Sequence, residues 1–170
     1  MGYLLVFLPT VLLILPFSLL CGCSNQKVIL RTGQAAPAFA LSDMQGNTVR
    51  VPEDIKGKVG VIRFWSDSCK SCAEEMPQID KLYKKYADEG LVILAVNIGE
   101  DKEAVEKFVN RLNISYMVLL DPGAAVTKRY GVVGVPTTFI IDRNGTIRQK
   151  ILGEAGAAAF ENMVLAQLKK

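Results

Sequence analysis

The sequence predicts an α/β fold, a three-layer α/β/α sandwich with a mixed central sheet and an N-terminal β-hairpin extension. From residue 59 onward, apolar runs alternate with helical patterns, an order typical of parallel strands joined by crossover helices. Asn144-Gly145 lies between two apolar runs, a strong hairpin signal that predicts an antiparallel final strand. A turn composition over 43–47 separates two short extended runs, 38–42 and 47–51, and predicts the N-terminal hairpin.

Each of the other elements is bounded by residues that begin or end it. The helix after the first long strand carries Met76, Ile79 and Leu82 at helical spacing, and Pro77 within it predicts a kink. Asp121-Pro122 supplies an N-cap residue and a proline for the first position of a short helix. We expect strands over 59–65, 91–96, 116–120, 134–142 and 147–152, and helices over 69–87, 101–112, 121–131 and 154–169.

Residues 1–23 are predicted to be a segment separate from the folded domain. Residues 3–20 form an apolar run with no polar face, and no charged side chain precedes Lys27. We interpret this run as an export signal or a membrane anchor, so the rest of the chain should face outside the cytoplasm. Residues 24–32 are then a tether, and 33–170 form the domain.

The end of this segment resembles the lipidation motif of bacterial lipoproteins. Cys23 is the candidate acylated cysteine, because Gly22 precedes it and Leu20 lies three residues before it. A cysteine at position 21 and the lack of an early Lys or Arg depart from that motif. An uncleaved anchor helix, just long enough to span a membrane, remains the alternative.

Composition narrows the chemistry that the chain can perform. The net charge is only +3 without a dense basic cluster, so we expect no nucleic-acid partner. The absence of histidine excludes Ser–His and Cys–His catalysis and any metal site that needs imidazole. The four cysteines form two close pairs, at 21/23 and 69/72. A four-thiolate zinc site would need both pairs, and the first adjoins the membrane-type segment, so we expect no metal.

The second cysteine pair lies where a strand gives way to a helix. An apolar run ends at Trp65, a polar turn follows, and Cys69-Lys70-Ser71-Cys72 begins the helical pattern. A helix N-terminus carries partial positive charge and free N–H groups, which stabilise an anion such as a thiolate. Because the thiolate is the nucleophile in disulfide exchange, the pattern predicts thiol–disulfide chemistry with Cys69 as nucleophile.

The flanking motifs resemble those of the thioredoxin superfamily. Phe64-Trp65 precedes the cysteine pair, and Gly134-Val135-Pro136-Thr137 follows about 65 residues later. Further motifs are similar to the TlpA/ResA-like branch of membrane- or lipid-anchored thiol–disulfide oxidoreductases: Ala36-Pro37-x-Phe39-x-Leu41, Asp43-x-x-Gly46, Gly57-Lys58-Val59 and Cys72-x-x-Glu75-Met76-Pro77. The resemblance covers residues 33–168.

This resemblance implies a role for each candidate site residue. Cys69 corresponds to the exposed attacking cysteine, and Cys72 to the buried resolving cysteine. Pro136 corresponds to a cis-proline that lies against the pair and helps to hold the substrate backbone. Glu75 matches a glutamate thought to tune the thiols or relay their protons, with an ordinary surface carboxylate as the alternative. Lys70 either assists the thiolate by its charge or is simply solvated.

The resemblance also implies partners and a direction of reaction. It indicates a reductase of protein disulfides, such as that of apocytochrome c before haem attachment, which a membrane thiol-transfer protein re-reduces. No cofactor is needed, and we expect a monomer.

Two residues depart from the family pattern: Ser68 replaces a common tryptophan, and Arg63 stands where thioredoxin has a buried acid. A buried arginine needs a partner, unless its side chain snorkels to the sheet edge.

Three other functions remain as alternatives. A peroxiredoxin-like peroxidase shares the Ala-Pro-x-Phe entry, but that class has Pro-x-x-x-Thr-x-x-Cys, and Ile62 stands at the proline position. An extracellular copper chaperone would use thiolate ligands, usually with a histidine that this chain lacks. A non-enzymatic binding domain would carry Cys69 and Cys72 as a structural disulfide.

Overall fold

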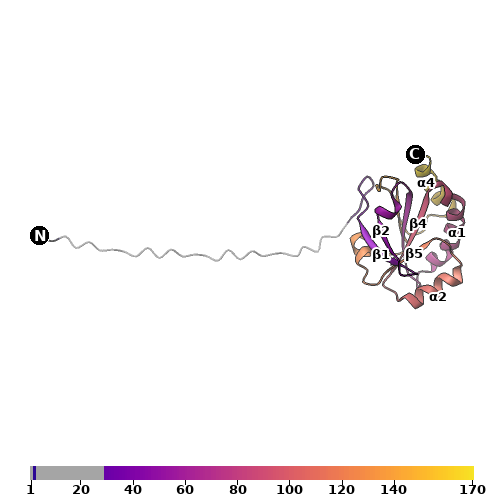
Figure 1. The fold of residues 1–170 in the computed structure, drawn as a ribbon, viewed down its shortest axis with the longest axis horizontal. Coiled ribbons are helices and arrows are strands. Elements are labelled where there is room, and N and C mark those ends of the chain that lie inside the picture. The colour runs from indigo at the N-terminus through magenta and orange to yellow at the C-terminus, as the bar shows by residue number, and fades with distance from the viewer. Residues whose placement is uncertain (1, 3–28) are drawn as a thin grey trace.

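Seven strands form one mixed sheet in the computed structural model, which describes residue 2 and residues 29–170 (Figure 1). The order across the sheet is β2-β1-β5-β4-β3-β6-β7. Strand β3 pairs in parallel with β4 and antiparallel with β6, and the β1–β2 hairpin adds to β5 at the edge. The strands are β1 (Phe39–Asp43), β2 (Thr48–Val51), β3 (Val59–Trp65), β4 (Leu91–Ile98), β5 (Met117–Asp121), β6 (Thr137–Ile141) and β7 (Ile147–Leu152).

Helices cover the two faces of the sheet unequally. The longer helices α1 (Lys70–Tyr86), α2 (Lys102–Leu112) and α4 (Ala157–Leu168) pack on one face (Figure 1). The short α3 (Ala125–Arg129) and the 3-10 turn η1 (Glu53–Ile55) contribute to the core on the other face. A second 3-10 turn, η2 (Ala87–Glu89), follows α1. The predicted α/β sandwich, its element order and its N-terminal hairpin are therefore confirmed.

Strand β3 separates the two halves of the core. All of its residues are buried, and successive side chains of a strand point to opposite faces. Val61 and Trp65 pack on the side of α1, α2 and α4, whereas Ile62 and Phe64 pack toward α3 and the N-terminal hairpin. By this alternation Arg63 lies on the same face as Trp65, underneath α1. The strand therefore places a charged side chain below the helix that carries the cysteines.

The helix α3 differs from the sequence prediction. Asp121 is the last residue of β5, and α3 begins at Ala125. Because pairing with β4 keeps Asp121 extended, the prediction that Asp121-Pro122 begins the helix is wrong. The Asp121 carboxylate nevertheless accepts hydrogen bonds from the N–H groups of Val126 and Thr127, at 3.3 and 2.8 Å. The residue thus satisfies helix N-terminal donors from its place in the strand.

The predicted membrane or lipoprotein segment, 1–23 with Cys23, lies outside the described residues except for residue 2, as does most of the tether. Within residues 2 and 29–170, none of the helices has the length and apolar character needed to cross a membrane. The chain joins the sheet where Gly33 N–H donates to the carbonyl of Ile147, and Ile147 N–H to that of Gln34, both at 2.8 Å.

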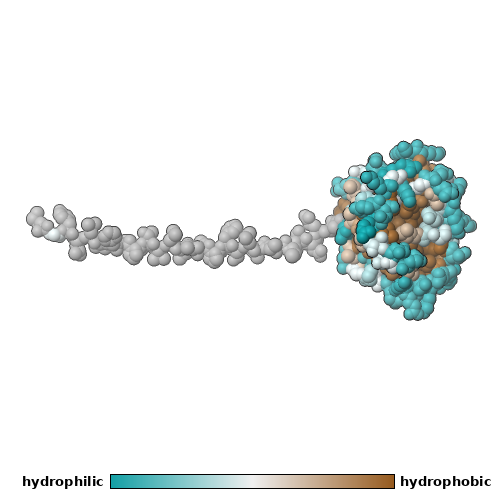
Figure 2. Space-filling model, in the orientation of Figure 1, coloured by the Kyte–Doolittle hydropathy of each residue, from teal (hydrophilic) through white to brown (hydrophobic). Residues whose placement is uncertain are grey.

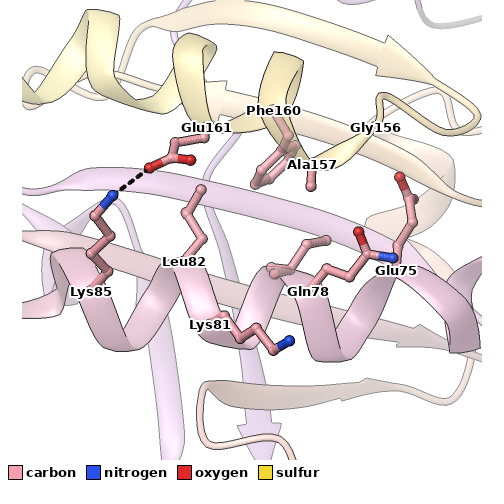
Figure 3. A pocket seen from close by; sticks show the side chains of 10 residues that line it. Glu75, Gln78, Lys81, Leu82, Lys85, Gly156, Ala157, Phe160 and Glu161 are labelled. Atoms are coloured by element: carbon pink, nitrogen blue, oxygen red, sulfur yellow. Dashed lines mark hydrogen bonds and ion pairs between the residues drawn. The ribbon is translucent and has the colours of Figure 1, made fainter.

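A groove of about 390 Å³ runs between α1 and α4 (Figure 3). Ile79, Leu82 and Phe160 supply its apolar lining, and an ion pair between Lys85 and Glu161, 2.8 Å long, crosses its rim. Glu75 lies at one end of this groove (Figure 3). Polar residues cover most of the visible face of the domain, with apolar residues between them (Figure 2).

Asp80 connects α1 to the segment before β5. Its carboxylate accepts hydrogen bonds from the N–H and hydroxyl of Ser115 at 2.6 and 2.8 Å, and pairs with Lys84 at 2.6 Å. Burial acts to raise the pKa of Asp80, but the bonds with Lys84 and Ser115 outweigh it and hold the pKa below its usual value. We expect Asp80→Asn to lower the free energy of unfolding by about 2 kcal/mol at neutral pH, because charged hydrogen bonds are lost.

This effect should disappear in acid. A carboxyl group whose pKa is lowered by folding stabilises the protein above its ordinary value of 3.8, and the stabilisation is lost as the pH falls through the folded-state pKa. Denaturant unfolding from neutral to acidic pH measures the difference between the two proteins. Glu74→Gln, which changes an exposed carboxylate of the same helix, is the matched control and should have little effect. A difference for Asp80→Asn that stays constant with pH would contradict the expectation.

Candidate active site

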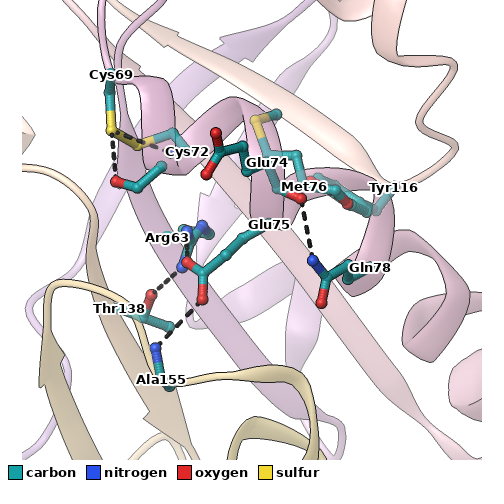
Figure 4. A network of polar contacts seen from close by, with 11 residues as sticks. Arg63, Cys69, Cys72, Glu74, Glu75, Met76, Gln78, Tyr116, Thr138 and Ala155 are labelled. Carbon is teal, nitrogen blue, oxygen red and sulfur yellow. Dashed lines mark hydrogen bonds and ion pairs between the residues drawn. A yellow bond between two sulfur atoms is a disulfide. The ribbon is translucent and has the colours of Figure 1, made fainter.

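Cys69 and Cys72 form a disulfide at the N-terminus of α1 (Figure 4). Cys69 is the N-cap residue, and its sulfur accepts a hydrogen bond from the N–H of Cys72 at 3.2 Å. Cys72 is fully buried, whereas Cys69 is partly exposed. A substrate from outside therefore reaches Cys69 first, and the helix N-terminus faces the sulfur that would carry negative charge.

An open groove surrounds Cys69 and extends to the loop before β6. Its lining combines small polar, charged and apolar side chains: Ser66, Ser68, Lys70, Ser71, Glu74, Val135 and Glu154. Val135 is joined to Pro136 by a cis peptide bond, the isomer that the sequence resemblance implies. Pro136 is buried and Val135 is half-buried in the groove, so the residue ahead of the proline lies on the same surface as Cys69.

Below the disulfide, Arg63 of β3 and Glu75 of α1 form an ion pair (Figure 4). Nη2 of Arg63 lies 2.5 Å from Oε2 of Glu75, and Nη1 donates to the hydroxyl of Thr138 at 3.0 Å. The second Glu75 oxygen accepts the N–H of Ala155 at 3.2 Å. Only 2% of the Arg63 side chain and 14% of the Glu75 side chain are exposed. Arg63 therefore does not snorkel to the sheet edge, and Glu75 is a largely buried partner in an ion pair.

Known proteins share this arrangement of fold and sequence. The AhpC/TSA family model matches residues 32–150. The thiol–disulfide oxidoreductase ResA of Geobacillus thermodenitrificans is 38% identical over 148 residues, which cover 87% of this chain and 84% of the relative. The ResA protein of Bacillus cereus is 36% identical over 154 residues, which cover 88% of each chain. The chain belongs to the ResA-like thiol–disulfide oxidoreductases of the AhpC/TSA family.

Solved structures agree with this membership. A Chlorobium tepidum protein described as a thiol:disulfide interchange protein DsbE superimposes on this ResA-like chain with a TM-score of 0.77 and 33% identity, covering 82% of this chain and 99% of that one. The thioredoxin domain of a thiol–disulfide oxidoreductase from Bacteroides vulgatus gives a TM-score of 0.73 and 29% identity, covering 81% and 98%. The thioredoxin-like fold and the thiol–disulfide oxidoreductase class follow from these relationships.

Sequence reasoning missed a polar cluster that holds the loop before the cysteines. Asn97, fully buried at the end of β4, donates a hydrogen bond to Oε2 of Glu100. The other Glu100 oxygen accepts the N–H of Asp67, two residues before Cys69, at 2.8 Å. Burial, together with the neighbouring Asp67 carboxyl, raises the pKa of Glu100. The sequence feature that could have indicated this cluster is the asparagine in an otherwise apolar strand, because a buried amide needs hydrogen-bond partners.

Two residues that the sequence singled out, Lys70 and Ser68, lie beside the cysteines. The Lys70 side chain is 90% exposed and lies 3.8 Å from the exposed Glu74, which favours a solvated lysine over one directed at the thiolate. Ser68 is exposed and its hydroxyl lies 3.1 Å from that of Ser66.

Among residues 2 and 29–170, no three His, Cys, Asp or Glu side chains are grouped so that they could hold a metal ion.

Proposed function

We propose that this protein reduces disulfides of other proteins outside the cytoplasm. The observation that carries the proposal is the Cys69–Cys72 disulfide at the N-terminus of α1, with the more reactive position partly exposed in an open groove. Val135 lines the same groove as Cys69, which supports a role for the adjoining Pro136 in holding the substrate backbone. Similarity to the ResA thiol–disulfide oxidoreductases supports the reaction class.

The reaction follows from the different exposure of the two cysteines. In the reduced protein, the Cys69 thiolate attacks one sulfur of the substrate disulfide, forms a mixed disulfide and releases the other substrate sulfur as a thiol. The Cys72 thiol then loses its proton and attacks Cys69, which frees the second substrate thiol and restores the Cys69–Cys72 disulfide. Glu75 lies one helical turn beyond Cys72 on the face of α1 that meets the sheet, where it can influence this proton loss.

The cycle needs a partner that returns two electrons to the disulfide. We propose a membrane thiol-transfer protein as the donor, and protein clients such as apocytochrome c before haem attachment as the acceptors. The apolar run at 3–20 supports attachment to the membrane, either through a lipid on Cys23 or as an uncleaved helix. Mass spectrometry of the mature N-terminus distinguishes the two, because a lipoprotein would begin at a lipidated Cys23, whereas an uncleaved anchor would keep the apolar run at 3–20.

The midpoint reduction potential of the Cys69–Cys72 pair tests the direction of electron flow. For a reductase we expect a value near that of thioredoxin, about −270 mV, because its dithiol must donate electrons. The measurement is equilibration of the purified protein with glutathione or dithiothreitol buffers, followed by thiol alkylation and mass spectrometry. A value near about −120 mV, as for DsbA, would mean that the protein donates disulfides instead.

The match to the AhpC/TSA family makes a thiol peroxidase the second candidate. A peroxidase of this kind has a proline at the position of Ile62, whose side chain is fully buried in β3 and packs on the face opposite α1. We therefore expect hydrogen peroxide consumption no faster than that of a free thiol. A peroxide-dependent turnover that Cys69→Ser abolishes would favour the peroxidase.

A further inference from the structure

A permanent positive charge lies under the active-site helix. The guanidinium belongs to Arg63, whose side chain is only 2% exposed. It uses Nη2 for Glu75 and Nη1 for Thr138, while its Nε has no hydrogen-bond partner among the described residues. A buried ion is costly unless it is paired, so the Glu75 carboxylate and the guanidinium stabilise each other in charged form.

The ion pair is close to the resolving cysteine. Cys72 and Glu75 are three residues apart on α1 and therefore lie on the same face, within one helical turn. Figure 4 shows the Arg63–Glu75 ion pair below the Cys69–Cys72 disulfide, beneath the first turns of α1. Burial strengthens electrostatic interactions because little water screens them. Both charges therefore act on any negative charge that forms on the thiols.

The other groups that face Arg63 add no uncompensated charge beside the Arg63–Glu75 ion pair. Tyr116, the residue just before β5, is close enough for the arginine charge to act on its hydroxyl, but burial raises its pKa far above the usual value, so it stays neutral. Thr138 of β6 and the Ala155 N–H before α4 are uncharged partners. Asp80, farther along α1, is neutralised by its own ion pair with Lys84. Arg63 and Glu75 are thus the opposing charges beneath Cys72.

We propose that Arg63 is a positioning residue for thiol–disulfide exchange: its guanidinium holds the Glu75 carboxylate in a fixed place, and the two opposite charges together set how readily the reduced cysteines form thiolates. This proposal rests on the proposed function, because it concerns the same cysteines. It assigns no contact with the substrate to Arg63. The residue acts through Glu75 and through the field at Cys72.

The proposal predicts changes of opposite sign for the two partners. Arg63→Met leaves the carboxyl group without its cation, so thiolates are less stable and the pH midpoint of cysteine alkylation should rise by about one unit. Glu75→Gln leaves the cation unbalanced, so the same midpoint should fall by about one unit. The double variant removes both charges and should return near the wild type. Arg63→Lys keeps the charge and should restore most of the wild-type profile.

The experiment measures iodoacetamide alkylation of each cysteine of the reduced full chain by mass spectrometry across pH, and unfolding stability in parallel. Shifts of opposite sign that cancel in the double variant support the proposal. Two results would overturn the proposal: lower stability with unchanged pH midpoints, or midpoints of both variants that move in the same direction. Either result would mean that the ion pair only stabilises the fold. If Arg63→Met does not fold, the other two variants test the proposal. Arg63→Lys must then keep a near-wild-type pH profile, and Glu75→Gln must lower the pH midpoint of alkylation.

This outcome is independent of the direction of electron flow. If the wild-type protein proves to donate disulfides, the proposed reductase function fails, but the opposite shifts of the two variants are still required. If the protein is a reductase and the variants show no opposite shifts, only the role of Arg63 fails.

Discussion

Replacement of Cys69 by serine is expected to abolish the reduction of protein disulfides. A serine hydroxyl stays protonated at neutral pH and cannot replace a thiolate as the attacking group, and the buried Cys72 is not accessible to a folded substrate. The measurement is reduction of insulin disulfides by the protein in the presence of dithiothreitol. We expect the rate to fall to that of dithiothreitol alone.

Cys72→Ser should behave differently, because it leaves the first step intact. Cys69 still attacks the substrate, but no neighbouring thiol resolves the product, so a mixed disulfide between Cys69 and the substrate should accumulate. Non-reducing electrophoresis and mass spectrometry detect this species. Lys102→Ala, a change of an exposed residue at the start of α2, is the control and should keep nearly full activity. Undiminished turnover by Cys69→Ser, or trapping through Cys72 in that variant, would contradict the assigned order.

Phe139→Ala should cause the largest loss of stability that we predict. Phe139 is fully buried in β6, and its ring packs edge-on against Phe64 and Tyr130, with centroids 6.1 and 5.2 Å away. Truncation to alanine removes these ring contacts and leaves a cavity in the core on this face of the sheet, which lowers the free energy of unfolding by about 3–5 kcal/mol. Denaturant unfolding, followed by the fluorescence of Trp65, measures the change.

Phe139→Leu is the matched control for that loss. Leucine fills much of the space and should cost roughly half as much or less, because volume-conserving apolar changes are tolerated best. Under conditions in which both variants are folded, their thiol alkylation should follow the wild-type pH profile, since Phe139 lies on the face of the sheet opposite α1. A loss below about 1 kcal/mol for Phe139→Ala would mean that the site collapses around the smaller residue.

Local signals in the sequence determined the order of the elements and the position of the reactive cysteines. Continuous apolar runs such as 91–96 are typical of buried parallel strands, and the Asn144-Gly145 turn specifies a hairpin. The cysteine pair follows a strand and begins a helix, so its place at a helix N-terminus depends only on neighbours in the chain. These features were predictable because propensity, periodicity and turn chemistry act over a few residues.

Only the tertiary structure decided which polar side chains meet. Arg63 and Glu75 are 12 positions apart and lie on different elements, and Glu100 reaches Asp67 across 33 positions. Asp121 serves the N-terminus of α3 from within β5, because sheet pairing took precedence over its tendency to begin a helix. Such contacts depend on how strands register and helices pack, which no local pattern specifies. The sequence by itself thus determined the thiol chemistry and the order of the fold, whereas packing decided which charges surround the thiols.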